Sequence, residues 1–254
     1  MMIKTKSIII NLIYPLIMLG LIMLIWAVAA KQIGSEFILP SIPDTLIQLK
    51  KLLLLDSFWL SYLNTIIRCF ESFLISFSFA IIFTVISKLY KPARLLLSPL
   101  VSVIRALPTM AIILLLVIWT NSSIAPLFIS IIVIFPTLYS QYLGEITGID
   151  SKLLEMSKVY KVPRTRTITK LYIPQMLPVI VSSIGSGLSL TLKLMVAAEV
   201  LAQTVNSIGG MMQTSKVYFE IGQLMALTII TVITGLIFEI TATFFKPLWR
   251  WKND

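Results

Sequence analysis

Histidine is absent from this chain of 254 residues, and cysteine occurs once, as Cys69. Without histidine there is no imidazole to bind a metal or to act as a general base. A single cysteine cannot form a disulfide within the chain. The GxxxxGK[ST] phosphate-binding loop is also missing, since the nearest pair of glycines, in 144-GEITG-148, has no lysine beside it. Energy must therefore come from another subunit or from an ion gradient.

Charged residues are scarce too. They make up 13% of the chain, whereas 57% of the residues are hydrophobic; a soluble domain typically has about 25% charged residues. Uncharged apolar runs long enough to cross a bilayer recur along the whole length. Because apolar residues run together rather than alternating, the pattern favours helices over the strands of a β-barrel. The composition therefore predicts an all-α, multi-pass integral membrane protein.

About six membrane-spanning helices are expected, because about 20 apolar residues cross a hydrocarbon core of about 30 Å. The first could instead be a secretory signal, since 27-AVA-29 resembles a cleavage site, but its uncharged run of 24 residues exceeds the usual length of about 7–15. The third is irregular because it holds Pro99, Arg105 and Pro108, and treating it as re-entrant would leave five spans. The expected spans are 8–30, 63–87, 95–119, 124–143, 177–201 and 221–245.

Lysine and arginine are unevenly divided between the two sides of these spans. The side that carries both termini has 14 of the 21, including six in the segment 144–175, and the other side has 4. Cytoplasmic loops carry the excess of Lys and Arg in membrane proteins. Both termini and the segment 144–175 are therefore predicted to be cytoplasmic. This asymmetry also accounts for the net charge of +10 without any nucleic-acid partner.

The segment 144–175 contains a pattern typical of a short amphipathic helix. Asp150 or Ser151 can cap its start, and Pro163 is expected to stop it. Such a helix could lie on anionic lipid or dock into the groove of a protein partner, and the pattern alone leaves both open. Its apolar stripe consists of Leu153, Met156, Val159 and Tyr160.

A polar stripe runs along the fifth expected span. It could pack closely against another helix through small residues or line a wet pathway. A lysine at a helix centre costs about 2.5–3.5 kcal/mol, so Lys193 should face water or an acid. Glu199 lies about 120° around the helix from Lys193 and is expected to meet another span or to sit near the outer mouth. The possible lining residues are Ser182, Ser186, Ser189, Lys193 and Glu199.

Three other charged residues inside the spans have expected roles. Arg68 and Glu71 share a helix face at i,i+3 and are expected to form an ion pair. Arg105 is expected to anchor the cytoplasmic side of the third span. No role is assigned to Glu239, which lies near the inner end of the last span.

The cytoplasmic helix resembles a motif of the ABC importer permeases. The run 155-EMSKVYK-161, followed by 173-IP-174 and Pro178, is similar to the "EAA" loop of that family. Glu155 matches the motif's glutamate. Met156 and Ser157 stand where the alanines sit, and Lys161 stands at the glycine.

Further segments extend the resemblance to about residues 37–248. The run 39-LPSIPDTL-46 is similar to the family's LPSP entry, and 104-IRALPTMA-111 to its R-A-I-P segment. The run 192-LKLMVAAEVLA-202, followed by 207-SIGG-210, is similar to its W-K-x-x-V-A-A-E segment and the glycine-containing loop after it. The branch with which these segments agree serves nitrate, sulfonate, taurine and thiamine-precursor importers.

The resemblance implies the type I importer permease fold, with the chain 1–254 as a single transmembrane permease domain in a bacterial inner (plasma) membrane. It implies a homodimer that forms the pathway of a small solute, either anionic or a small organic compound of those classes. A separate ATPase subunit would use ATP and Mg, and a periplasmic or lipid-anchored protein would deliver the solute. Neither a catalytic residue nor a cofactor is expected on this chain. The implied ATPase-coupling residues are Leu153, Glu155, Met156, Ser157, Val159, Tyr160 and Lys161.

An ion-coupled secondary transporter is the alternative. It would require acidic residues near the middle of the spans and repeated, broken helices. The spans have few acids at that depth, and no internal repeat is visible. A membrane-embedded enzyme is disfavoured by the lack of histidine, of an HExxH motif and of paired aspartates within the spans.

Overall fold

The computed structural model describes the backbone of residues 2–245 and the side chains of residues 14–241. Over that part every regular element is a helix. The basic tail residues, Lys246, Arg250 and Lys252, lie outside the described residues. The elements are α1 (Met2–Ile33), α2 (Ile42–Leu53), α3 (Asp56–Leu89), α4 (Lys91–Ala106), α5 (Thr109–Trp119), α6 (Ala125–Gly148), α7 (Ser151–Val159), α8 (Arg164–Thr167), the π-helical turn η1 (Ile168–Tyr172), α9 (Ile173–Ala202), α10 (Ile208–Val217) and α11 (Ile221–Phe245).

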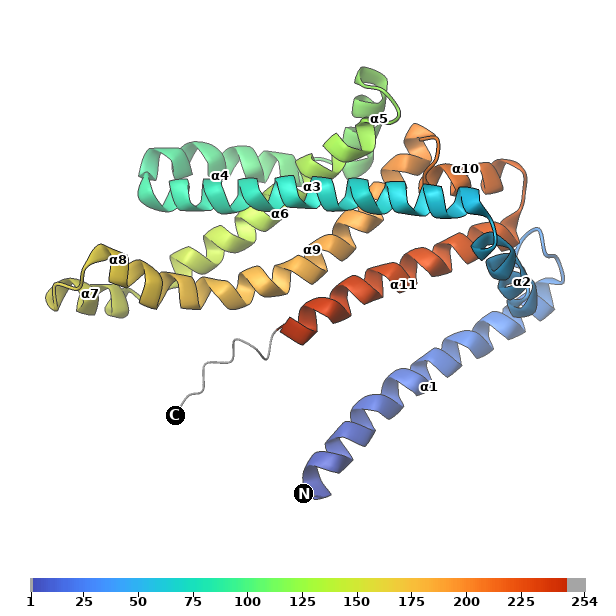
Figure 1. Cartoon of the computed structure of the whole chain (residues 1–254), viewed down its shortest axis with the longest axis horizontal. Helices are drawn as coiled ribbons and strands as arrows, with labels where there is room; N and C mark the ends of the chain where they lie inside the picture. Colours follow the sequence, from blue (N-terminus) through green and yellow to red (C-terminus); the bar gives the residue numbers. More distant parts are fainter. Residues whose placement is uncertain (1, 246–254) are drawn as a thin grey trace.

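Long helices run along the length of the molecule. Figure 1 shows α3, α6, α9 and α11 in roughly the same direction, with α7 at one end and α2 and α10 at the other. Five helical segments are long and apolar enough to cross a membrane: 14–33, 56–89, 125–148, 164–202 and 221–241. They confirm five of the six expected spans. At 1.5 Å per residue, the 34 residues of α3 reach roughly 51 Å, which exceeds a hydrocarbon core of about 30 Å.

The expected third span, 95–119, is not one straight helix. It consists of α4 and α5, which meet at an angle of 94°. Pro108 explains the break, because a proline disfavours the helical conformation at the residue before it, and Leu107 is extended (φ −68°, ψ 134°). The pair can form a broken span or a re-entrant loop, so the described part of the chain has five spans, or six if the pair counts as one.

The break also determines where Arg105 lies in the bundle. This residue lies at the end of α4 and lines a small cavity of about 110 Å³ with Val133, Pro136 and Thr137 of α6. These three residues lie near the middle of α6 rather than at its end. The expected anchor on the cytoplasmic side is therefore wrong, because α4 begins at Lys91 and carries Arg105 inward along the bundle.

Small side chains let the central helices approach closely. Cys69, Ser72, Ser76 and Ala80 line one face of α3 and have no exposed surface, and the Cys69 thiol lies 3.8 Å from the carbonyl oxygen of Leu188 on α9. The serine hydroxyls bond to carbonyls of their own helix, so their burial leaves no donor without a partner. In lipid, where apolar surfaces gain nothing from leaving water, such close packing is a principal source of helix association.

The glycine-containing segment 207-SIGG-210, which resembles a loop of the permease family, is the start of the helix α10. Ser207 caps it: its hydroxyl accepts a hydrogen bond from the amide of Gly210 at 2.9 Å and donates one to the carbonyl of Thr204 at 2.7 Å. Serine at the N-cap stabilises a helix start. A ten-residue helix of low amphipathicity leaves little periodic pattern, which is why its sequence suggests a loop.

Candidate functional site

The short helix α7 lies at one end of the molecule, beyond the ends of α6 and α9 (Figure 1). Asp150 caps it by accepting a hydrogen bond from the amide of Lys152 at 2.9 Å. Leu154 is half-buried against the main hydrophobic core. Ser157 on the same side donates to the carbonyl of Leu154 at 2.8 Å. The helix is therefore seated on the bundle by one side only.

The other side of α7 faces outward. No residue of this helix is buried, and Glu155 is exposed as well. The predicted apolar stripe is therefore not covered by the described part of this chain. Such a stripe is typical of a helix that docks into a groove or lies on lipid. The exposed fractions are 39% for Leu153, 54% for Met156, 76% for Val159 and 74% for Tyr160.

The end of α7 depends on Lys161, which has a left-handed backbone conformation with φ 50°. The amide of Lys161 donates to the carbonyl of Lys158 at 3.0 Å, and the amide of Val162 donates to that of Ser157 at 2.9 Å. These two bonds form a Schellman motif, whose left-handed position is usually glycine. The helix therefore ends at Val159, earlier than the expected stop at Pro163. Glycine, which the similar motif has at this position, adopts the left-handed conformation without strain, whereas Lys161 adopts it at a conformational cost.

A nearly continuous helix joins α7 to the centre of the bundle. Only residues 160–163 separate α7 from α8, and helical backbone then continues to Ala202. Within it, the amide of Ile173 bonds to the carbonyl of Ile168, five residues back. Pro174 follows directly, and a proline ring clashes with the carbonyl four residues earlier in a regular α-helix. The wider π-helical turn accommodates that ring, so α9 reaches α7 without a flexible linker.

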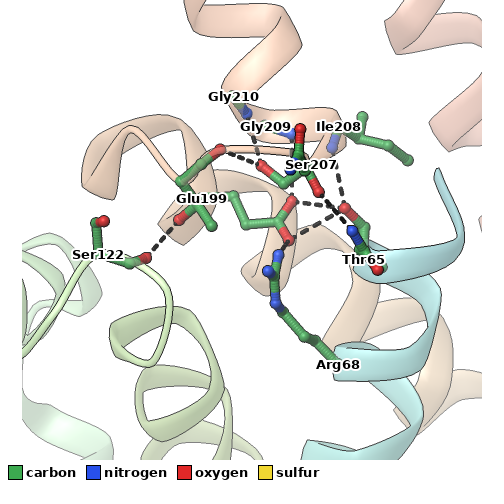
Figure 2. Close-up of polar contacts among 11 residues, drawn as sticks. Thr65, Arg68, Ser122, Glu199, Ser207, Ile208, Gly209 and Gly210 are labelled. Atoms are coloured by element: carbon green, nitrogen blue, oxygen red, sulfur yellow. Dashed lines mark hydrogen bonds and ion pairs between the residues drawn. The ribbon is translucent and has the colours of Figure 1, made fainter. Parts of the chain in front are cut away.

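At the opposite half of α9, the carboxylate of Glu199 is fully buried and binds three groups (Figure 2). Arg68 Nη1 forms an ion pair with Oε1 at 3.2 Å. The hydroxyl of Thr65 donates to Oε2 at 2.9 Å, and the amide of Gly209 donates to Oε2 at 3.2 Å. The Thr65 hydroxyl also accepts from the amide of Ile208 at 2.9 Å. One carboxylate thus connects α3, α9 and the start of α10.

The prediction that Glu199 meets another span is confirmed, and the expected pair of Arg68 with Glu71 is wrong. Glu71 is exposed, whereas Arg68 turns to the buried carboxylate, which has no water to solvate it. Spacing on one helix could not reveal a stronger partner on another. Because Glu199 has 0% exposed surface, it cannot line an open surface of this chain. Its role is to hold the three helices together.

Glycine at position 209 is required by this arrangement. A Cβ there would overlap the Cβ of Glu199 and lie 2.7 Å from the carbonyl oxygen of Val196. The start of α10 therefore packs directly on the backbone of α9. This close approach is what allows the amide of Gly209 to reach the carboxylate.

The polar stripe of α9 is only partly exposed. Ser186 and Lys193 are exposed, Ser182 is half-buried and Ser189 is buried. Lys193 lines an open cavity of about 470 Å³ between α5, α9 and α11, together with Thr228 and other residues. Lys193 has no carboxylate partner among the described residues, where the only ion pair is that of Arg68. A lysine within a span should face water, and this cavity offers that exposure.

Comparison with known proteins decides the family. Residues 73–251 match the family described as "Binding-protein-dependent transport system inner membrane component". The chain belongs to this family. It is a multi-pass membrane permease, as its apolar helices and its sequence motifs predict.

Curated relatives agree with this assignment. The permease is 25% identical over 247 residues to the aliphatic sulfonates transport permease protein SsuC of Bacillus subtilis, covering 94% of this chain and 87% of that protein. It is also 25% identical over 206 residues to an ABC transporter permease protein of Haemophilus influenzae, covering 80% of this chain and 81% of that one.

Solved structures share the fold at low sequence identity. A bacterial alginate ABC transporter, crystallised with an alginate-bound periplasmic protein, matches with a TM-score of 0.65 at 16% identity, over 98% of this chain and 97% of that chain. An amino acid ABC transporter crystallised with histidines matches with a TM-score of 0.64 at 17% identity, over 74% and 91%. The permease therefore has the expected type I importer fold.

The buried ion pair predicts that replacing Glu199 lowers the free energy of unfolding far more than replacing Glu71. Glu199→Leu leaves Arg68 and the amide of Gly209 without a partner, and we expect it to cost about 3–5 kcal/mol of unfolding free energy. Glu71→Gln, on the exposed face of α3, should change it by less than about 0.5 kcal/mol. Unfolding of the detergent-solubilised permease by a denaturant measures both. Equal costs would contradict the Arg68–Glu199 pair.

The left-handed conformation of Lys161 predicts that glycine at position 161 and glycine at position 158 change hydrogen exchange at the end of α7 in opposite directions. Lys161→Gly relieves a conformational cost of roughly 1 kcal/mol and should slow hydrogen exchange of the Val162 amide. Lys158→Gly lies within the helix, where glycine costs about 1 kcal/mol, and should speed up that exchange. Hydrogen–deuterium exchange of a peptide covering 150–163 tests this. The Schellman motif is refuted if both glycines change exchange in the same direction.

Proposed function

We propose that α7 is the element through which a separate ATPase drives this permease. The observation that carries the proposal is an exposed apolar stripe on a short helix. Only residues 160–163 separate this helix from the helical backbone that continues into α9. Helix-in-groove recognition uses anchors spaced as Leu153, Met156 and Tyr160 are spaced. Glu155 stands beside the stripe, exposed and at the place of the family's glutamate. The proposed contact surface is Leu153, Glu155, Met156, Ser157, Val159, Tyr160 and Lys161.

A stiff connection would carry movement from the ATPase into the membrane. If closure of the two ATPases shifts α7, the helix beginning at Arg164 must follow, since only 160–163 separate them. Through Glu199, the far half of α9 is tied to α3 and α10. We infer that these helices move as one body and that the pathway opens and closes beside them. ATP and Mg would be used by the partner and not by this chain.

The cargo is proposed to be a small anion of the nitrate, sulfonate or taurine type. Lys193 faces an open cavity within the span region, and Ser182 and Ser186 continue its face of α9 toward the α7 end. A cation without a carboxylate partner attracts negative charge in such a cavity. The likeness to an aliphatic sulfonates permease agrees with this class. Ser189 and Glu199, being buried, are left out of the proposed lining.

The end opposite α7 is the proposed docking side for a solute-binding protein. An open cavity of about 500 Å³ lies there between α3, α10 and the start of α11. Uncharged amides line much of it, and such groups can hydrogen-bond to a partner surface or a passing solute without binding it tightly. By the charge asymmetry this side is periplasmic. The amide residues are Gln203, Asn206, Gln213 and Gln223.

We further propose that the permease acts as a homodimer in a bacterial inner membrane. No described side chain of α1 is buried, and Figure 1 shows this helix apart from the bundle. Its fixed point is next to α2, where Trp26 donates to the carbonyl of Pro40 at 3.0 Å. An apolar helix held at one end can cover a second copy as well as face lipid.

Coupling through α7 predicts that one charge on the stripe uncouples the ATPase. Met156→Asp would bury a carboxylate in an apolar cleft, so we expect stimulation of ATP hydrolysis by the loaded binding protein to fall about tenfold or more. Lys158→Asp, also exposed on α7 but on the face of the helix opposite the stripe, should leave stimulation nearly unchanged. The assay is ATP hydrolysis by the reconstituted transporter. Normal stimulation with Met156→Asp would remove the docking role.

An anionic cargo predicts that the charge at position 193 matters. Lys193→Met should lower the initial rate of alkanesulfonate uptake about tenfold, because the attraction of a cation in a partly desolvated cavity is lost. Lys193→Arg should keep most of the rate. Lys216→Met, which removes an exposed lysine of α10, is the control. Uptake into proteoliposomes measures this, and equal rates for the two methionine variants would exclude Lys193 from selecting the cargo.

A further inference from the structure

A groove near the α7 end of the molecule has no role in the proposed transport cycle. It lies between the last turns of α3, the end of α6 and the start of the helix that continues into α9, and its volume is about 400 Å³. This is within the range of about 300–1,000 Å³ that is usual for small-molecule sites. Ile81, Val85 and Met176 are typical of its walls, which are almost entirely apolar.

One wall of the groove contains a hydroxyl without a partner. Thr84 is 2% exposed, and its Oγ1 makes no hydrogen bond within the part of the chain that the structure describes. Other threonines of these helices bond to the carbonyl four residues back, as Thr137 and Thr191 do. Buried polar groups are normally satisfied. A buried hydroxyl without a partner in the wall of a cavity therefore points to a ligand that supplies the partner.

A cation stands one helical turn beyond that hydroxyl. Lys88 also lines the groove; its ammonium donates to the carbonyl of Ile146 at 3.2 Å and lies 5.3 Å from the centre of the Tyr172 ring. An ammonium has three N–H donors, so donors remain for another group. Arg94 is near enough to act on Lys88 electrostatically. Two neighbouring cations, of which Lys88 lines the apolar groove, favour a negatively charged head with an apolar body.

We propose that this groove binds one anionic glycerophospholipid from the leaflet on the α7 side. Lys88 and Arg94 take the phosphate, Thr84 donates to an ester carbonyl, and the apolar walls hold an acyl chain. Along α3 the ammonium, the hydroxyl and the apolar wall follow one another at steps of about one turn, or 5.4 Å, in the same order as phosphate, ester and chain in the lipid. Anionic lipids are enriched in the cytoplasmic leaflet, which is the side that the charge asymmetry assigns to α7.

The occupied groove would support the link between α7 and α9. Ile168 and Tyr172, which belong to the π-helical turn η1, line the groove, so the acyl chain packs against that turn. This consequence rests on the proposed coupling function, whereas the binding itself does not. A lipid that stiffens the turn makes transmission of movement dependent on the composition of the membrane.

Native mass spectrometry of the purified full-length permease tests the binding. With phosphatidylglycerol and phosphatidylcholine of equal chain length as probes, we expect one retained phosphatidylglycerol per chain, bound about tenfold more tightly than phosphatidylcholine. Thr84→Val keeps the volume and removes the hydroxyl, and it should weaken retention about tenfold. Val85→Trp, which fills the groove, should abolish it.

Ile82→Trp is the matched control. Ile82 is 51% exposed, like Val85 at 46%, but it is not among the residues that line the groove, so retention should be unchanged. Equal retention of the two lipids, equal effects of the two tryptophans, or replacement of the phospholipid by a free fatty acid would overturn the proposal. So would a change in subunit stoichiometry with Val85→Trp, which would make the groove an interface between copies. None of these measurements involves transport, so their failure leaves the proposed function intact.

Discussion

The buried carboxylate of Glu199 is the interaction on which the arrangement of the half of the permease opposite α7 depends. A carboxylate inside a membrane protein is stable only if charge and hydrogen bonds replace its water, and here Arg68, Thr65 and the amide of Gly209 do so. These groups belong to different helices. None of the helices can shift alone without leaving a charge or a donor unpaired, so the network favours movement of α3, α9 and α10 together.

At the opposite end of the molecule, α7 is held by few contacts and has no buried residue. There, α7 is seated through Leu154, and the rest of its surface is open. Its two ends are set by the side-chain cap of Asp150 and by the left-handed backbone of Lys161. The helix that ends at Ala202 connects this open end to the fixed one. A partner that binds α7 therefore contacts one end of a long helix whose other end is bound to α3 and α10 through Glu199.

Residue patterns were sufficient for five of the six spans, for the start of α7 and for the family, because length, apolar content and capping residues are local properties. They failed where a local preference met a stronger contact elsewhere. Arg68 had a plausible partner at Glu71, yet the burial of Glu199 decided the pairing. The end of α7 depends on a φ of 50° at Lys161. The sequence does not indicate this conformation, because lysine rarely adopts a positive φ. A proline indicates a break, but neither the size of the bend at Pro108, 94°, nor the short helix α10 leaves a clear apolar period in the sequence.

The break between α4 and α5 has a consequence for hydration. The first amides of a helix have no partner within it, and at the start of α5 the bonds begin at Ala111, whose amide bonds to the carbonyl of Pro108. Free backbone groups cannot face hydrocarbon, and a charged residue, Arg105, lies in the last turn of the preceding helix. The break between α4 and α5 is therefore a place that solvent or a second subunit, rather than acyl chains, has to cover, whether or not a solute is being carried.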